Sequence, residues 1–275
     1  MQTTVAPIGM DELCLQLSAL GLRRGDTVLV HASRGATLPV AGGHRAVLAA
    51  LSLCVGPRGT VAMPAFSSAA LMPTGTAALG AEALARVDMA VPGFCPDRSP
   101  ADLSGPLAQT FLADEETRRS IHPVYSLAAR GHRAAALTTH HPRDWPMGQD
   151  GPMGRLLEMP DAVMLRLGGA SWPGCPVLVM AETMARHRRL SVVRFKDARR
   201  GRWVHFRDIA EDREAFYPAL GAALEKDENY RPGIVAGHAA GICRIDDMVA
   251  FAAPRISAAV FSTAPARRPG TTANA

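Results

Sequence analysis

The residues best suited to chemistry lie at two glycine-containing turns, each followed by a helical pattern. Ser33 and the pair Gly42-Gly43 bound a loop between an apolar run and one of these helices. Backbone N–H groups at such a helix start can cradle phosphate groups. Cys175 precedes the other helix, whose N-terminus would lower the pKa of the thiol and favour an acyl-accepting nucleophile. The alternative at Cys175 is an inert small residue.

Histidines are the other candidates for chemistry near neutral pH. His132, His140 and His141 cluster in sequence, but they have neither metal-ligand spacing nor a cysteine or acidic partner. We therefore expect no metal site. His31, at the end of an apolar run, is interpreted as a packed side chain.

The pattern of apolar residues predicts the elements that carry these groups. Strands are predicted over residues 27–31, 60–64, 126–129 and 162–167, and helices over 9–20, 44–55, 101–117, 177–188, 211–225 and 245–253. The alternating stretch 202–207 is typical of an exposed antiparallel strand, and 67–100 of a long loop or small insertion. We expect an α/β fold: a mixed, mostly parallel sheet flanked by helices, with a small additional lobe. One domain would span 1–263, with a disordered tail over 264–275.

Charge and cysteine content argue against several functional classes. The formal net charge is +5 and arginine supplies almost all of the cations, but aromatic residues make up only 5% of the chain. Without a nucleic-acid-binding signature, a solvated basic face or contacts to a phosphorylated cofactor explain the arginines better.

Five widely spaced cysteines indicate free thiols and a reducing cytoplasm, with no structural zinc. No 18-residue apolar run or export signal is seen, so we expect no membrane association.

An ordered set of motifs resembles the aminoglycoside 3-N-acetyltransferase group of the antibiotic N-acetyltransferase family. The matches run from about residue 10 to 253 and include Val30-His31-Ala32-Ser33, Gly42-Gly43, Val55 to Thr60, Met63 to Ser67, Ser120 to Ser126, His141 to Gly148, Gly151 to Leu156 and Cys243 to Phe251. Each motif alone is weak, whereas the ordered set is specific.

The resemblance implies a fold, a donor and an acceptor. The fold would be aminoglycoside 3-N-acetyltransferase-like, the acyl donor acetyl-CoA, and the acceptor a small-molecule amine, often an aminoglycoside, with no metal required. Contacts to the cofactor are implied for Ser33, Gly42, Gly43, Ser120 and Ser126. Arg34 stands at a position that is usually apolar in the family, where it could add a phosphate contact or simply reach solvent. The sequence is compatible with a monomer or a homodimer.

One position departs from the family pattern. The family places a general-base histidine three residues before a glutamate, so that both reach one cleft from the same helix face. In this chain Glu182 is retained, but Val179 stands in the place of the histidine, and Cys175 in that of an asparagine. Valine cannot accept a proton, so the family mechanism cannot run unmodified.

Four residues are candidates for the altered chemistry. His122 could act as a displaced base or could instead fix its own loop, and Cys175 could form a covalent acyl intermediate. Asp144 and Glu182 could bind a cationic acceptor or orient a base, against the simpler interpretations of a turn cap and a surface carboxylate.

Three functions follow from this departure. The first is a CoA-dependent N-acyltransferase with a non-standard base, acting on an aminoglycoside-like or biosynthetic amine. The second is a repurposed relative with different chemistry on a thioester or related small molecule. The third is a protein that binds a CoA ester or an amine metabolite without catalysis.

Overall fold

The computed structural model describes residues 6–33, 38–170, 172–185, 190–209 and 216–262. Its main sheet has strand order β3-β4-β2-β1-β5-β9-β8. The strands are β1 Thr27–Ala32, β2 Thr60–Pro64, β3 Arg118–Arg119, β4 Leu127–Gly131, β5 Ala162–Leu167, β8 Arg231–Val235 and β9 His238–Arg244. A separate two-stranded sheet consists of β6 Leu190–Asp197 and β7 Arg202–Ile209.

The helices are α1 Met10–Leu20, α2 Gly43–Val55, α3 Ala81–Ala90, α4 Pro106–Leu112, α5 Ala134–Thr138, α6 Pro152–Leu157, α7 Pro176–Thr183, α8 Phe216–Leu224 and α9 Ile245–Ser262. Two 3-10 turns, η1 Thr76–Ala78 and η2 Trp172–Gly174, lie in the connections.

The core of the sheet is parallel. β1 pairs in parallel with β2 on one side and with β5 on the other, whereas β4 and β9 add antiparallel strands outside them. This confirms the α/β class and the mixed sheet built around parallel strands. The carboxyl ends of β1 and β5 therefore lie side by side.

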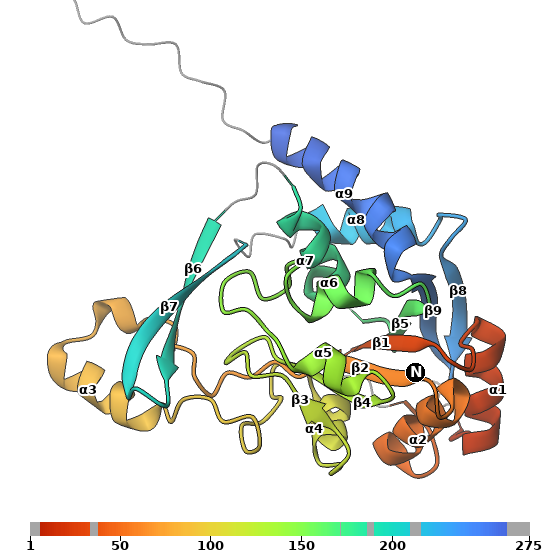
Figure 1. Ribbon diagram of the computed structural model, residues 1–275, viewed down its shortest axis with the longest axis horizontal. Coiled ribbons are helices and arrows are strands. Elements are labelled where there is room, and N and C mark those ends of the chain that lie inside the picture. The colour runs from red at the N-terminus through yellow and green to blue at the C-terminus, as the bar shows by residue number, and fades with distance from the viewer. Residues whose placement is uncertain (1–5, 34–37, 171, 186–189, 210–215, 263–275) are drawn as a thin grey trace, which may run out of the picture.

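Alternation along β1 divides the core into two layers. Val28 and Val30 pack into the apolar layer with α1, α2 and α4, whereas Leu29 faces the layer built from α5 to α9. Figure 1 shows the two layers, with α7, α8 and α9 above the sheet and α1, α2 and α4 below it. Helices cover both faces of the sheet, as expected from the sequence.

The additional lobe is formed by the β6–β7 hairpin and α3, on the left of Figure 1. One face of the hairpin packs Phe195 and Phe206 against Ala70 and Val124. Helix α3 is held at the hairpin by the Trp203 indole N–H, which donates to Asp88 Oδ1 at 2.9 Å. The antiparallel strand predicted at 202–207 is confirmed, and the insertion at 67–100 contains α3.

Three predicted helices have wrong bounds, and one of them, predicted over 177–188, ends at Thr183. The helix predicted over 101–117 is limited to Pro106–Leu112, because the chain turns back into β3 soon afterwards. The helix predicted to end at 253 continues through Pro254 to Ser262. A proline removes one backbone hydrogen bond from a helix without necessarily ending it, and Ala252 and Ile256 on either side are buried. The tail predicted over 264–275 lies outside the described residues.

Candidate active site

The candidate cofactor loop lies at the carboxyl ends of the central parallel strands. Ser33 follows β1, and its backbone N–H donates to Leu167 O at the end of β5, at 3.1 Å. A small pocket here is lined by Ser33, His44 and Gly168, together with Val47 of α2 and the first residues of α4. Ligands of α/β proteins commonly bind at the carboxyl ends of neighbouring parallel strands, where this pocket lies.

Glycines shape the start of α2 beside this pocket. Gly42 has φ 88° and Gly43 has φ 62°, in the left-handed region that favours glycine. The reversal turns the chain into a helix whose first residues, including His44, line the pocket. The structure therefore places Ser33 and the start of α2, which follows the turn at Gly42, beside one small pocket. Arg34 lies outside the described residues.

Helix α7 carries Val179, the position at which we expect a departure from the family pattern. It begins after Cys175 with Pro176, a residue well suited to a first helical turn. Val179 and Glu182 lie three positions apart on this helix, and both are buried. His187, in the predicted continuation of the helix, lies outside the described residues.

Glu182 has a hydrogen-bond donor from another helix. The hydroxyl of Tyr217 in α8 donates to Glu182 Oε2 at 2.5 Å. Both side chains are almost fully buried, so the carboxylate is not a helix-surface group. Sequence analysis did not identify Tyr217, because no motif links α8 to position 182.

His122 is held at both ring nitrogens. Nδ1 accepts the backbone N–H of Tyr125 at 2.9 Å, and Nε2 lies 3.0 Å from Arg143 O, so the network assigns the proton to Nε2. The side chain is only 1% exposed, and burial lowers its pKa to about 3. This geometry favours the loop-fixing interpretation over a displaced base, because both ring nitrogens already bond backbone groups.

Ser120 and Ser126 are also committed to buried networks. Ser120 Oγ accepts the N–H of Leu127 and donates to Nδ1 of His141 at 2.7 Å. Ser126 Oγ donates to Ala65 O at 2.6 Å. Neither serine is exposed, so cofactor contact by these hydroxyls would require a rearrangement. Their geometry favours the role of fixing the segment 120–127.

The lowered pKa expected for the Cys175 thiol is wrong, and the structure favours the alternative of an inert small residue. Burial raises the pKa of Cys175 to about 11, although the backbone N–H groups of Val177 and Leu178 act in the opposite direction. The side chain is fully buried in the layer around α7. Desolvation of the thiolate outweighs the effect of the helix N-terminus, so the thiol is held in its weakly nucleophilic form.

Asp144 ties the block before α6 to the small lobe. Its Oδ2 accepts from Nε and Nη2 of Arg207 at 2.9 and 2.7 Å, and its Oδ1 accepts the Arg207 backbone N–H. These hydrogen bonds lower the pKa of the Asp144 carboxyl. The group acts as a bridge to β7, and its charge is already matched by a guanidinium.

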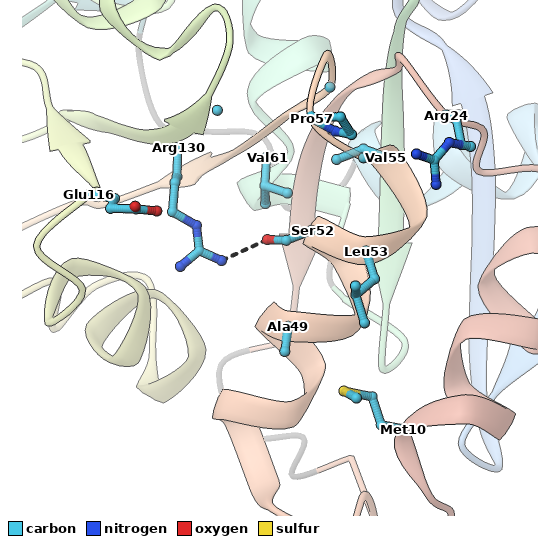
Figure 2. Close-up of a pocket in the computed structure, with 13 residues that line it drawn as sticks. Met10, Arg24, Ala49, Ser52, Leu53, Val55, Pro57, Val61, Glu116 and Arg130 are labelled. Carbon is cyan, nitrogen blue, oxygen red and sulfur yellow. Dashed lines mark hydrogen bonds between the residues drawn. The ribbon is translucent and has the colours of Figure 1, made fainter.

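A second, larger cavity lies away from these residues. This groove of about 860 Å³ is lined by Met10, Arg24, Leu53, Val61 and Arg130, among others. Figure 2 shows Arg130 bonded to a serine of α2 across the groove. It includes the start of β2 and the end of α2, and none of the predicted site residues lines it.

The described residues contain neither a metal-binding cluster nor a membrane-spanning helix. No group of three or more His, Cys, Asp or Glu residues among them has an arrangement that could hold a metal ion. In the same part of the chain, no helix combines the length and apolar character needed to cross a membrane.

The fold is that of an α/β protein with a pocket at the carboxyl edge of two parallel strands, and helix α7, which follows β5 in the chain, bears a buried carboxylate. Comparison with known proteins identifies the family. The family described as Aminoglycoside 3-N-acetyltransferase matches residues 29–257. Aminoglycoside N(3)-acetyltransferase VII of Streptomyces paromomycinus is 35% identical over 228 residues, which cover 78% of this chain and 75% of the relative.

Solved structures agree with this match. Aminoglycoside acetyltransferase AAC(3)-Xa superposes with a TM-score of 0.82 at 29% identity, over 91% of this chain and 93% of that one. AAC-VIa bound to sisomicin gives a TM-score of 0.76 at 26% identity, over 92% and 99%. The chain belongs to the aminoglycoside 3-N-acetyltransferase family, and it is an amine acetyltransferase by class.

Proposed function

We propose that this protein transfers an acyl group from acetyl-CoA to an amine of an aminoglycoside-like or biosynthetic small molecule, with Glu182 rather than a histidine as the proton acceptor. The observation that carries the proposal is the pairing on α7: the family match extends through this helix, while Val179 has no titratable group and Glu182 is buried three residues later.

The cofactor would bind at the pocket beside Ser33 and the start of α2. Backbone N–H groups and the glycine turn at Gly42 offer the uncharged donors that phosphate and pantetheine groups accept. We expect the acyl group to enter from this edge toward α7. The five cysteines are all unpaired, which supports a reducing, cytoplasmic setting for a thiol-releasing reaction.

The reaction needs one proton to leave the attacking nitrogen. The amine attacks the thioester carbonyl carbon, the carbon–sulfur bond breaks, and the nitrogen proton passes through the Glu182 carboxylate to the departing thiolate. The products are an amide and the free thiol of CoA. Direct attack is favoured over a covalent route, because the Cys175 thiol is buried and its pKa is raised to about 11.

Two measurements test the proposal. Calorimetric titration with acetyl-CoA should show saturable binding, and thiol release with sisomicin or another amine should exceed the rate of thioester hydrolysis without amine. Glu182→Gln should lower kcat by about 100-fold or more while acetyl-CoA still binds, since general-base catalysis is worth roughly 10²–10⁴-fold. Absence of acetyl-CoA binding would reject the donor, and an unchanged kcat in Glu182→Gln would reject the base.

A further inference from the structure

The contact between α8 and α7 has a clear donor and acceptor. Tyr217 Oη lies 2.5 Å from Glu182 Oε2 and 3.3 Å from Leu178 O. A phenol has a single proton, and the shorter contact to a carboxylate is the stronger one. Tyr217 therefore donates to Glu182, and Leu178 O is a secondary neighbour.

Both partners of this contact are buried. Glu182 is 3% exposed and Tyr217 is 1% exposed. A buried carboxylate is costly unless donors satisfy it. The side chain of Val179, on the same helix face, has no hydrogen-bond donor. The tyrosine comes from a helix 35 residues further along the chain, so tertiary packing alone supplies it.

We infer that Tyr217 is a positioning residue for the reaction, which holds the Glu182 carboxylate in one orientation in the absence of a histidine at position 179. The inference rests on the proposed function. The tyrosine keeps its own proton throughout; only the carboxylate gains and then loses the proton of the attacking amine. Because Oε2 is tied to a rigid helix, the carboxylate meets that proton from a fixed direction, as proton transfer requires.

A purely structural hydrogen bond is the competing explanation, and a matched tyrosine separates the two. Tyr230 is also buried, and its hydroxyl accepts from Arg166 Nε at 3.2 Å within the same apolar layer. Tyr230→Phe removes a comparable hydroxyl from the same layer without touching Glu182. It should lower the melting temperature much as Tyr217→Phe does, with kcat unchanged.

The experiment is a double-mutant cycle on kcat. Thiol release from acetyl-CoA with sisomicin is measured for the wild type, Tyr217→Phe, Glu182→Gln, the double variant and Tyr230→Phe. We expect Tyr217→Phe to lower kcat by about 10-fold, the loss of one hydrogen bond to a charged group. KM for acetyl-CoA should stay within about two-fold. In the Glu182→Gln background the same change should cost nothing further, since interacting residues are not additive.

The outcomes are distinct. A Tyr217→Phe variant with wild-type kcat, or one whose loss simply adds to that of Glu182→Gln, overturns the inference and leaves the proposed function standing. A wild type that binds no acetyl-CoA or transfers nothing to any amine tested overturns both. Should Tyr217→Phe fail to fold, Tyr217→Met enters the same cycle, with calorimetric acetyl-CoA binding as the check of an intact site.

Discussion

The two carboxylate oxygens of Asp144 accept hydrogen bonds from different parts of Arg207, one from its side chain and the other from its backbone. Oδ2 accepts both guanidinium contacts, and Oδ1 accepts the backbone N–H at 2.8 Å. In return, the N–H of Trp145 donates to Arg207 O at 2.8 Å. These contacts attach the hairpin lobe to the block that precedes α6.

Removing the charge at Asp144 should weaken this attachment slightly. Because the Arg207 side chain is 63% exposed and that of Asp144 35%, solvent screens the pair, and we expect Asp144→Asn to cost about 0.5–1 kcal/mol. The folded-state pKa of Asp144 is lowered, so its contribution is present above the unfolded pKa and is lost as pH falls. Urea unfolding at pH 7 measures the loss. Glu82→Gln, in an exposed helical pair with Arg86, is the control, and an equal loss there would contradict the prediction.

Two buried histidines should make the protein acid-sensitive. The rings of His122 and His141 lie 5.0 Å apart, and burial lowers their pKa values to about 3 and about 4, below the ordinary 6.5. Between pH 6.5 and 4 the unfolded chain therefore binds more protons, and the free energy of unfolding falls as pH drops. Each histidine contributes at most about 1.4 kcal/mol per pH unit.

Urea unfolding from pH 7 to 4.5 measures this slope. His141→Gln should lower stability at pH 7, because it loses the bond from Ser120, but it should also flatten the pH dependence. His132→Gln changes an exposed histidine and should leave the slope as in the wild type. A wild-type free energy that does not change over this range would contradict the prediction.

The cysteines should differ sharply in reactivity. A hydrogen bond from Arg98 lowers the pKa of Cys95, which is partly exposed, whereas burial raises the pKa of Cys175 to about 11 and that of Cys243 to about 12. Iodoacetamide at pH 7.5 should therefore modify Cys95 first, because the thiolate is the nucleophile. Peptide mass spectrometry follows each site, with Cys95→Ser as the control. Equally fast alkylation of Cys175 in the folded protein would show that its thiol is accessible.

Close packing between α8 and the turn before α7 should not tolerate a methyl group. A Cβ on Gly221 would collide with the ring atoms of Trp172, a buried side chain fixed by its own hydrogen bond to Glu225. We expect Gly221→Ala to lower the free energy of unfolding by about 2 kcal/mol, as overpacking of a core does. Thermal melts compare this variant with Gly80→Ala, which should be nearly neutral because no atom lies within 4 Å of a Cβ added at Gly80. Similar melting temperatures for the two variants would show that Trp172 can move aside.

A histidine introduced at position 179 should raise the rate. The position is on α7, three residues before Glu182, so an imidazole there would share its helix face. If the rest of the site is intact, Val179→His should increase kcat for thiol release by about 100-fold, at the lower end of what general-base catalysis supplies. Val179→Gln is the control, since it adds bulk and polarity without a base of suitable pKa. Equal rates for the two variants would mean that the missing imidazole is not what limits the reaction.

The sequence by itself determined the strands and helices whose burial pattern is local. The apolar runs at 27–31, 60–64 and 162–167 are β1, β2 and β5 in the structure, and α1 and α2 end at Leu20 and Val55, as predicted. Because motif order is also a property of the chain, the sequence was enough to suggest the family and to place Val179 beside Glu182.

Tertiary structure decided which groups meet. The periodicity of apolar residues indicates that a residue is buried, but not which residues surround it. The sequence therefore could not show that Tyr217 bonds Glu182, or that both ring nitrogens of His122 bond backbone groups. The same reason explains Cys175: its place before a helix is local, whereas the desolvation that raises its pKa comes from the surrounding layer. Helix α9 passes Pro254 because packing on both sides outweighs one missing hydrogen bond.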